Sequence, residues 1–128
     1  MSDTATIYLP FATDVVVKGF TNAGLMQRIT LAPETGSPIV FVGSGEQNTL
    51  IGRANFTTPA GTGDFTVVVT IENSQDGNSW SPSDIYVGVC AVRSYNLAVV
   101  VSEDMVDEDY NDAICMLSWP QSGDQKRK

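Results

Sequence analysis

Short segments in which every second residue is apolar are the feature of this sequence that most constrains the fold. Successive side chains of a β-strand point to opposite faces, so this alternation predicts strands, and the segments are rich in Val, Ile, Thr, Tyr and Phe. Turn signals with Gly, Pro and Asn separate the segments, and no stretch has the period of a helix of ordinary length. Nine strands are expected, at residues 7–9, 14–20, 25–31, 39–42, 49–56, 65–72, 85–92, 96–101 and 113–119. The chain is therefore predicted to be all-β, an antiparallel β-sandwich or barrel.

The size and composition fit one domain. The sequence has 128 residues, of which 42% are hydrophobic and 17% charged, and a chain of this size can bury a core without a disulfide or a metal. We expect one domain over residues 1–122 and a polar tail at 123–128. The first residues show neither the basic nor the apolar run of a signal peptide, and the longest apolar stretch is too short to span a bilayer. We therefore expect a protein made in the cytoplasm that does not insert into a membrane, with later release or surface attachment left open.

Charge and residue types exclude several functions. Asp and Glu number 15 against 7 for Lys and Arg, and the resulting formal charge of −8 makes nucleic acid an unfavourable partner. The sequence contains no histidine, which removes the usual general base and the Ser-His and Cys-His nucleophilic pairs. Cys90 and Cys115 lack the spacing of a metal site. They are predicted to be two small buried side chains in strands, and a bridge between them is left open.

The segment 102–112 is strongly acidic. It holds six of the 15 carboxylates, and without these six the formal charge would be −2. Two carboxylates 4 Å apart repel by about 4 kcal/mol at an effective dielectric near 20, so the group needs a counter-charge or wide spacing. A solvated acidic loop is the ordinary interpretation. However, apolar strands flank the segment, and the alternation of Asp107, Asp109 and Asn111 allows several oxygens to face inward. Oxygen ligands of this kind suit calcium, which takes six to eight of them.

The acidic segment does not form an EF-hand. Asp112 stands where that loop requires glycine, and Ser118 stands where it requires glutamate. Two adjacent calcium ions that share bridging carboxylates would match the charge of the segment. A glycosidase pair is disfavoured, because the acids are contiguous on one loop instead of opposed across a cleft.

The acidic segment also resembles a known family. Ser102-Glu103-Asp104, then Asp107-x-Asp109-Tyr110-Asn111-Asp112-Ala113 and the following Trp119-Pro120, are similar to the LecB-type bacterial lectins. The likeness extends over most of the chain, including a turn at 20–24 and the segment 81–84. It implies a Greek-key β-sandwich that is not an enzyme. It also implies binding of mannose- or fucose-type glycans through two adjacent calcium ions, in a homo-oligomer (a dimer or tetramer).

The resemblance assigns the site residues one by one. The implied calcium ligands are Asn22, Glu103, Asp107, Asp109, Asn111 and Asp112. The implied sugar contacts are Asn22, Ala23, Gly24, Asp107, Asp109, Asn111 and Asp112. In the family, a serine at the position of Ala23 accompanies a preference for fucose. Ala23 lacks that hydroxyl, so the resemblance favours mannose for this chain.

The chain departs from the family pattern at its C-terminal end. Family members end shortly after the Trp-Pro pair, and their terminal carboxylate ligates calcium in a neighbouring subunit. This sequence continues, so either the ligand from the neighbouring subunit is lost, or Asp124 replaces it, or the tail is a cloning or family-specific extension. The alternative function is a structural or adhesive β-sandwich in which calcium only rigidifies a loop.

Overall fold

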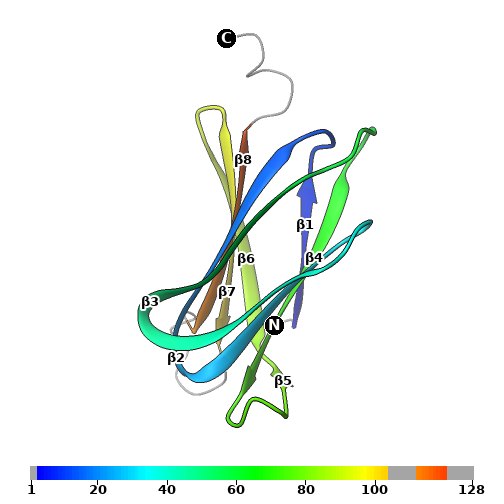
Figure 1. Ribbon diagram of the computed structural model, residues 1–128. Helices are drawn as coiled ribbons and strands as arrows, with labels where there is room; N and C mark the ends of the chain where they lie inside the picture. Colours follow the sequence, from blue (N-terminus) through cyan, green and yellow to red (C-terminus); the bar gives the residue numbers. More distant parts are fainter. Residues whose placement is uncertain (1–2, 104–111, 121–128) are drawn as a thin grey trace.

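The computed structural model describes residues 3–103 and 112–120, and this part of the chain forms eight strands and no helix (Figure 1). None of it could therefore cross a membrane as a helix. The strands are β1 (Thr4–Leu9), β2 (Asp14–Pro33), β3 (Ile39–Thr57), β4 (Phe65–Ser74), β5 (Ser81–Pro82), β6 (Asp84–Val92), β7 (Tyr95–Glu103) and β8 (Ala113–Pro120).

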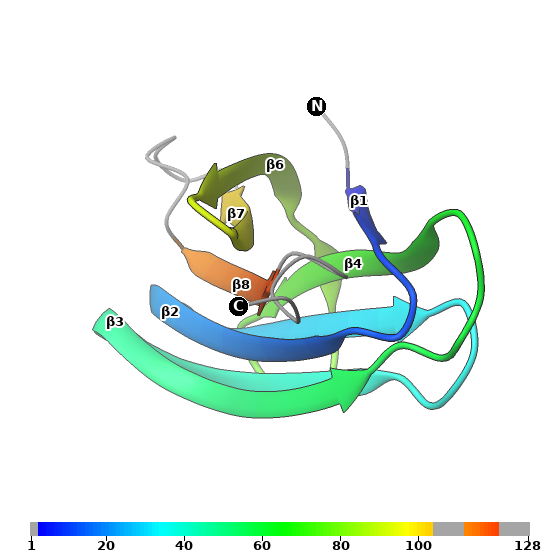
Figure 2. The same ribbon diagram turned by 90° about the horizontal axis from the view of Figure 1, so that it is seen from above.

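The strands form an antiparallel sheet that folds over on itself into a sandwich. Their order is β1-β4-β2-β8-β7-β6, with β3 added beside β2 and β5 beside β4. The neighbours β1–β4 and β2–β8 are distant in sequence, as in Greek-key connections. Figure 2 shows the curved β2–β3 ribbon on one side of the molecule and β6 on the opposite side. The predicted antiparallel β-sandwich is confirmed.

Strand β2 belongs to both layers of the sandwich. Its first half pairs with β8, from Val16 opposite Ser118 to Thr21 opposite Ala113. Its second half pairs with β4, from Met26 opposite Ser74 onward. The register of β2 against β3 shifts between Thr21 and Gln27, and such irregularities bend a strand and let it change sheets. We call residues 22–25 of β2 the corner.

The structure corrects several sequence-based expectations about the strands. The turn predicted at 20–24 is wrong, because the chain bends there inside one strand and does not reverse. The separate strands expected at 14–20 and 25–31 are both part of β2, and those expected at 39–42 and 49–56 are both part of β3. The two-residue strand β5 was not predicted. The described part therefore has eight strands instead of nine.

Alternating side chains of both layers form the core. The core packs β2, β4 and β8 against one another and so supports the corner. The largest fully buried hydrophobic side chains are Phe65, Ile7, Leu9, Ile29, Leu31, Ile71, Ile85 and Leu117. Phe11 closes one end with an edge-to-face contact to Phe65, at 5.7 Å between ring centroids. Side chains buried to this degree contribute about 1.5–3 kcal/mol each through burial. The corner therefore rests on a fixed framework.

The two cysteines differ in their surroundings, and both are free thiols. Cys115 lies in the core, where burial raises the pKa of its thiol to about 12, so it stays protonated and acts as a small hydrophobic residue. Cys90 is exposed, so the prediction that both are buried is wrong for Cys90. The reason is that β6 is an edge strand whose residues from Tyr86 to Val92 are exposed on both faces.

Candidate functional site

The corner is fastened to the beginning of β8. The backbone N–H of Asn22 donates to the carbonyl of Asp112 at 2.9 Å, and the Thr21 hydroxyl donates to the same carbonyl at 2.9 Å. Ala23 is buried, and its N–H donates to the Thr21 hydroxyl at 3.2 Å. Gly24 is exposed, and a side chain there would meet nothing within 4 Å. The corner therefore combines a fixed backbone with open space beside Gly24.

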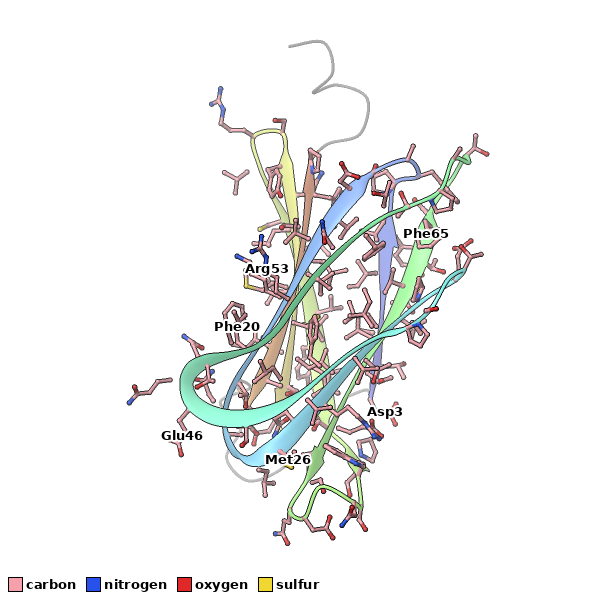
Figure 3. The ribbon with its side chains drawn as sticks, viewed as in Figure 1. Asp3, Phe20, Met26, Glu46, Arg53 and Phe65 are labelled. Carbon is pink, nitrogen blue, oxygen red and sulfur yellow. The ribbon has the colours of Figure 1, made fainter. Side chains whose placement is uncertain are left out.

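The bend of β3 orients the Asn22 side chain. Asn22 Nδ2 donates to Asn48 Oδ1 at 2.8 Å, and the Asn48 N–H donates to Asn22 Oδ1 at 2.6 Å. Gln47 and Asn48 have φ of 67° and 56°, the left-handed region in which asparagine is enriched among non-glycine residues. Sequence reasoning missed Asn48. The signal available was a polar Glu46-Gln47-Asn48 run between two strand patterns, and Figure 3 shows Glu46 at this bend.

Three buried carboxylate residues lie at the adjoining ends of β6, β7 and β8. Glu103 is 1% exposed, and Asp84 and Asp112 are each 7% exposed. Asp84 is the register partner of Glu103, which places the two side chains on one face of the sheet. The Asp112 N–H donates to the Ser102 carbonyl at 3.1 Å, so Asp112 lies beside the end of β7. Sequence reasoning gave Asp84 no role, although it closes the 81–84 segment of the family resemblance.

The structure brings together Asn22, Ala23, Gly24, Glu103 and Asp112. The other expected ligands, Asp107, Asp109 and Asn111, lie outside the described residues, as does Asp124. Within residues 3–103 and 112–120, no group of three acidic or thiol side chains could hold a metal ion on its own. Glu103 and Asp112 flank segment 104–111 on either side, so the acidic segment begins and ends beside the corner.

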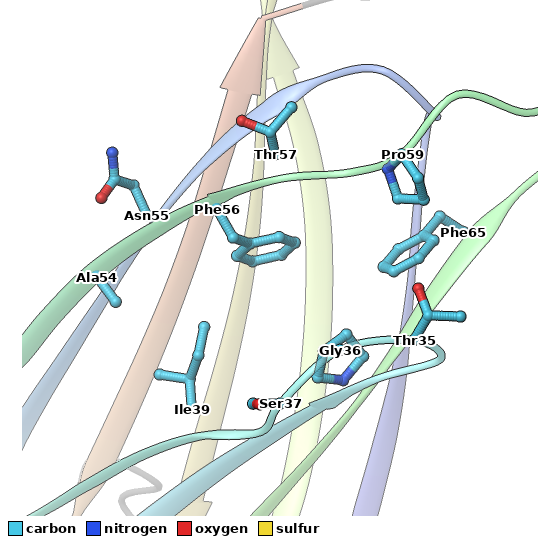
Figure 4. Close-up of a pocket in the computed structure, with 11 residues that line it drawn as sticks. Thr35, Gly36, Ser37, Ile39, Ala54, Asn55, Phe56, Thr57, Pro59 and Phe65 are labelled. Atoms are coloured by element: carbon cyan, nitrogen blue, oxygen red, sulfur yellow. The ribbon is translucent and has the colours of Figure 1, made fainter.

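An apolar cavity lies at the end of the β2–β3 ribbon away from the corner. It has a volume of about 410 Å³, and Phe56, Phe65, Ile39 and Pro59 form much of its wall (Figure 4). None of the side chains that line it is ionisable. It offers no carboxylate for a hard cation and no acid or base, so the corner is the stronger candidate for the functional site.

The fold and the corner together define a β-sandwich binding protein. The family model for fucose-binding lectin II (PA-IIL) matches residues 7–121, and the chain belongs to this family. It is therefore a lectin and not an enzyme, as the sequence predicts. A search of curated proteins found no match.

Solved structures of other lectins are also similar to this chain. A high-affinity mannose-binding lectin of Ralstonia solanacearum is 32% identical, with a TM-score of 0.72 over 90% of this chain and 95% of that one. A Chromobacterium violaceum lectin, CV2L, in complex with α-methyl-fucoside is 27% identical, with the same coverage and TM-score. The C-terminal domain of the BC2L-C lectin from Burkholderia cenocepacia is 26% identical, with a TM-score of 0.69 over 94% of this chain and 98% of that one.

Proposed function

We propose that this lectin binds mannose- or fucose-type glycans through two adjacent calcium ions at the corner. The observation that supports this is the meeting of Asn22, Glu103 and Asp112, which come from the corner of β2, the end of β7 and the residue before β8. The relatives that bind mannose and α-methyl-fucoside make the same sugar class the first choice.

The donor atoms available fit calcium. The residues that would hold the two ions are Asn22, Glu103, Asp107, Asp109, Asn111 and Asp112. All six offer carboxylate or amide oxygens, which calcium accepts in flexible geometry, whereas zinc prefers histidine and cysteine. When bound, the ions would supply positive charge that attracts sugar hydroxyls in place of water. The chain's own part is to hold these oxygens in place: the Asn48 hydrogen bonds orient Asn22, and the ends of β7 and β8 position Glu103 and Asp112.

Titration calorimetry tests the proposed function. The calcium-loaded protein is titrated with methyl α-mannoside, with L-fucose and with galactose as the control sugar. We expect heat of binding with mannoside or fucose. Clear calcium binding without heat from either sugar would favour the alternative, a structural or adhesive domain in which calcium only rigidifies a loop.

Ala23 is proposed to favour mannose over fucose. Ala23→Ser would add a hydroxyl at the corner, beside the expected sugar position, without changing the strand. One added hydrogen bond is worth about 1 kcal/mol, so we expect the fucose-to-mannose affinity ratio to rise roughly fivefold. Paired titrations of wild type and variant measure the ratio, and an unchanged ratio would show that Ala23 does not set specificity.

We also propose a homo-oligomer, with β6 in an interface. Val89 and Val92 are each 67% exposed, and the strand carries no charge from Ile85 to Val92. Proteins rarely leave a long, neutral, apolar edge strand uncovered. Sedimentation at micromolar concentration should give a mass of two or more chains, and Val89→Lys should shift it toward one. A wild-type mass of a single chain would contradict this proposal.

A further inference from the structure

A polar cavity lies at the corner, between Leu25 of β2, the end of β4 and the connection that leads to β5. Its volume is about 410 Å³. Leu25 forms one wall, and Asn73, Gln75, Asp76, Ser79 and Ser81 supply amide, carboxylate and hydroxyl groups around it. Figure 3 shows Met26, the neighbour of Leu25, at the end of the molecule where β4 meets this connection.

The cavity is close both to the corner and to the buried carboxylates. Leu25 follows Ala23 by two residues in β2, a separation of about 7 Å along a strand. On the other side, Asn73 Nδ2 donates to the Ser83 hydroxyl at 2.8 Å. Ser83 precedes Asp84, the register partner of Glu103. The cavity therefore begins within about 7 Å of Ala23, close to the expected sugar position.

The wall of the cavity is held rigidly. Asp76 Oδ1 accepts hydrogen bonds from the N–H groups of Asn78 and Ser79 at 2.8 and 2.9 Å, and from the Ser74 hydroxyl at 3.1 Å. These bonds lower the pKa of Asp76, so it is a fixed anion at neutral pH. A carboxylate in a defined position is a good acceptor for a hydroxyl group.

Trp80 lies between Ser79 and Ser81 in the sequence, and its side chain is also fixed. The guanidinium of Arg28 stacks on its ring at 4.3 Å from the centroid, and Arg28 Nε donates to Glu72 at 2.8 Å. These contacts tie the β4–β5 connection to β2. The cavity is therefore formed before any ligand arrives, which lowers the entropic cost of binding.

We propose that this cavity is a subsite for a second, uncharged sugar unit of a glycan whose first unit binds at the corner. The inference rests on the proposed function. The chemistry of the wall matches such a ligand, because hydroxyls, amides and one carboxylate can bond sugar hydroxyls while Leu25 contacts an apolar sugar face. The negative charge of Asp76 disfavours sialylated or sulfated units, so the ligand class is neutral oligosaccharides.

The test compares single sugars with disaccharides by calorimetry. The calcium-loaded protein is titrated with methyl α-mannoside and with the α1-2, α1-3 and α1-6 mannose disaccharides. One hydrogen bond corresponds to roughly fivefold in affinity, so at least one disaccharide should bind about fivefold to tenfold more tightly than the methyl glycoside. Ser79→Trp, which fills the cavity from an exposed position, should abolish that gain and leave the methyl mannoside affinity unchanged.

Control variants and separate outcomes distinguish a failure of the subsite from a failure of the proposed function. Ser94→Trp makes the same change at an exposed serine in the β6–β7 turn and should keep the disaccharide gain. Asp76→Asn keeps an amide oxygen for the backbone bonds and should relax the discrimination against a sialylated disaccharide. The subsite is refuted if methyl mannoside binds but no disaccharide binds more tightly, or if the gain survives Ser79→Trp. Failure of methyl mannoside and fucose to bind at all would overturn the proposed function and the subsite together.

Discussion

Removal of calcium with EDTA should abolish binding of methyl α-mannoside and lower the melting temperature by about 15 °C. An ion present at 100 times its dissociation constant stabilises a protein by about 2.7 kcal/mol, and two ions by about 5 kcal/mol. For a domain of this size, each kcal/mol shifts the melting temperature by roughly 3–4 °C. Scanning calorimetry and sugar titration before and after EDTA, and again after calcium is restored, measure both effects.

Three results would distinguish the models. Magnesium serves as the matched control, because it prefers fewer carboxylates and retains several waters, and it should restore little sugar binding. Mannoside binding that persists in excess EDTA would refute the calcium mechanism. A melting temperature that recovers with calcium while neither mannoside nor fucose binds would favour the structural alternative.

Glu103→Gln should lower calcium affinity about 100-fold and eliminate sugar binding at millimolar concentrations. The side chain is 1% exposed, and glutamine keeps its shape while it removes the negative charge and replaces one acceptor oxygen with an NH2 group. Loss of one partner from a buried charge pair costs about 3–5 kcal/mol, and 3 kcal/mol is more than 100-fold in affinity. Calcium titration of the wild type and the variant measures affinity and stoichiometry.

Glu34→Gln is the matched control for this variant. Glu34 is exposed in the turn between β2 and β3, where its Oε1 accepts bonds from the Thr66 N–H at 2.7 Å and hydroxyl at 3.0 Å. A glutamine oxygen can accept the same two bonds, so calcium affinity should not change. If Glu103→Gln and Glu34→Gln bind calcium alike, Glu103 is not a ligand.

The alternating apolar pattern predicted most of the fold. Ile29 and Leu31 in β2, and Cys115 and Leu117 in β8, are buried as their period of two requires. The pattern could not show that residues 14–33 form one strand. The bend at the corner depends on two different pairing partners, β8 and β4, and these are distant in sequence.

The candidate site was predicted in part. Asn22, Glu103 and Asp112 were expected on the strength of the family resemblance, and the structure brings them together. Asn48 was missed because its role depends on hydrogen bonds to Asn22 across the β2–β3 ribbon. Asp84 was missed because only the register of β6 against β7 places it opposite Glu103. The exposure of Cys90 follows from the position of β6 at the sheet edge, which composition does not reveal.

The double pairing of β2 limits how this lectin can evolve new specificities. An insertion of one residue at the corner would slide the second half of β2 by one position against β4. Ile29 and Leu31 would then turn from the core toward solvent, and the domain would lose much of its stability. Substitutions at Ala23 and Gly24 leave the pairing of β2 with β8 and with β4 intact. Natural diversity at this corner should therefore consist of side-chain replacements at constant length, and libraries that seek new sugar preferences should vary identity and not length.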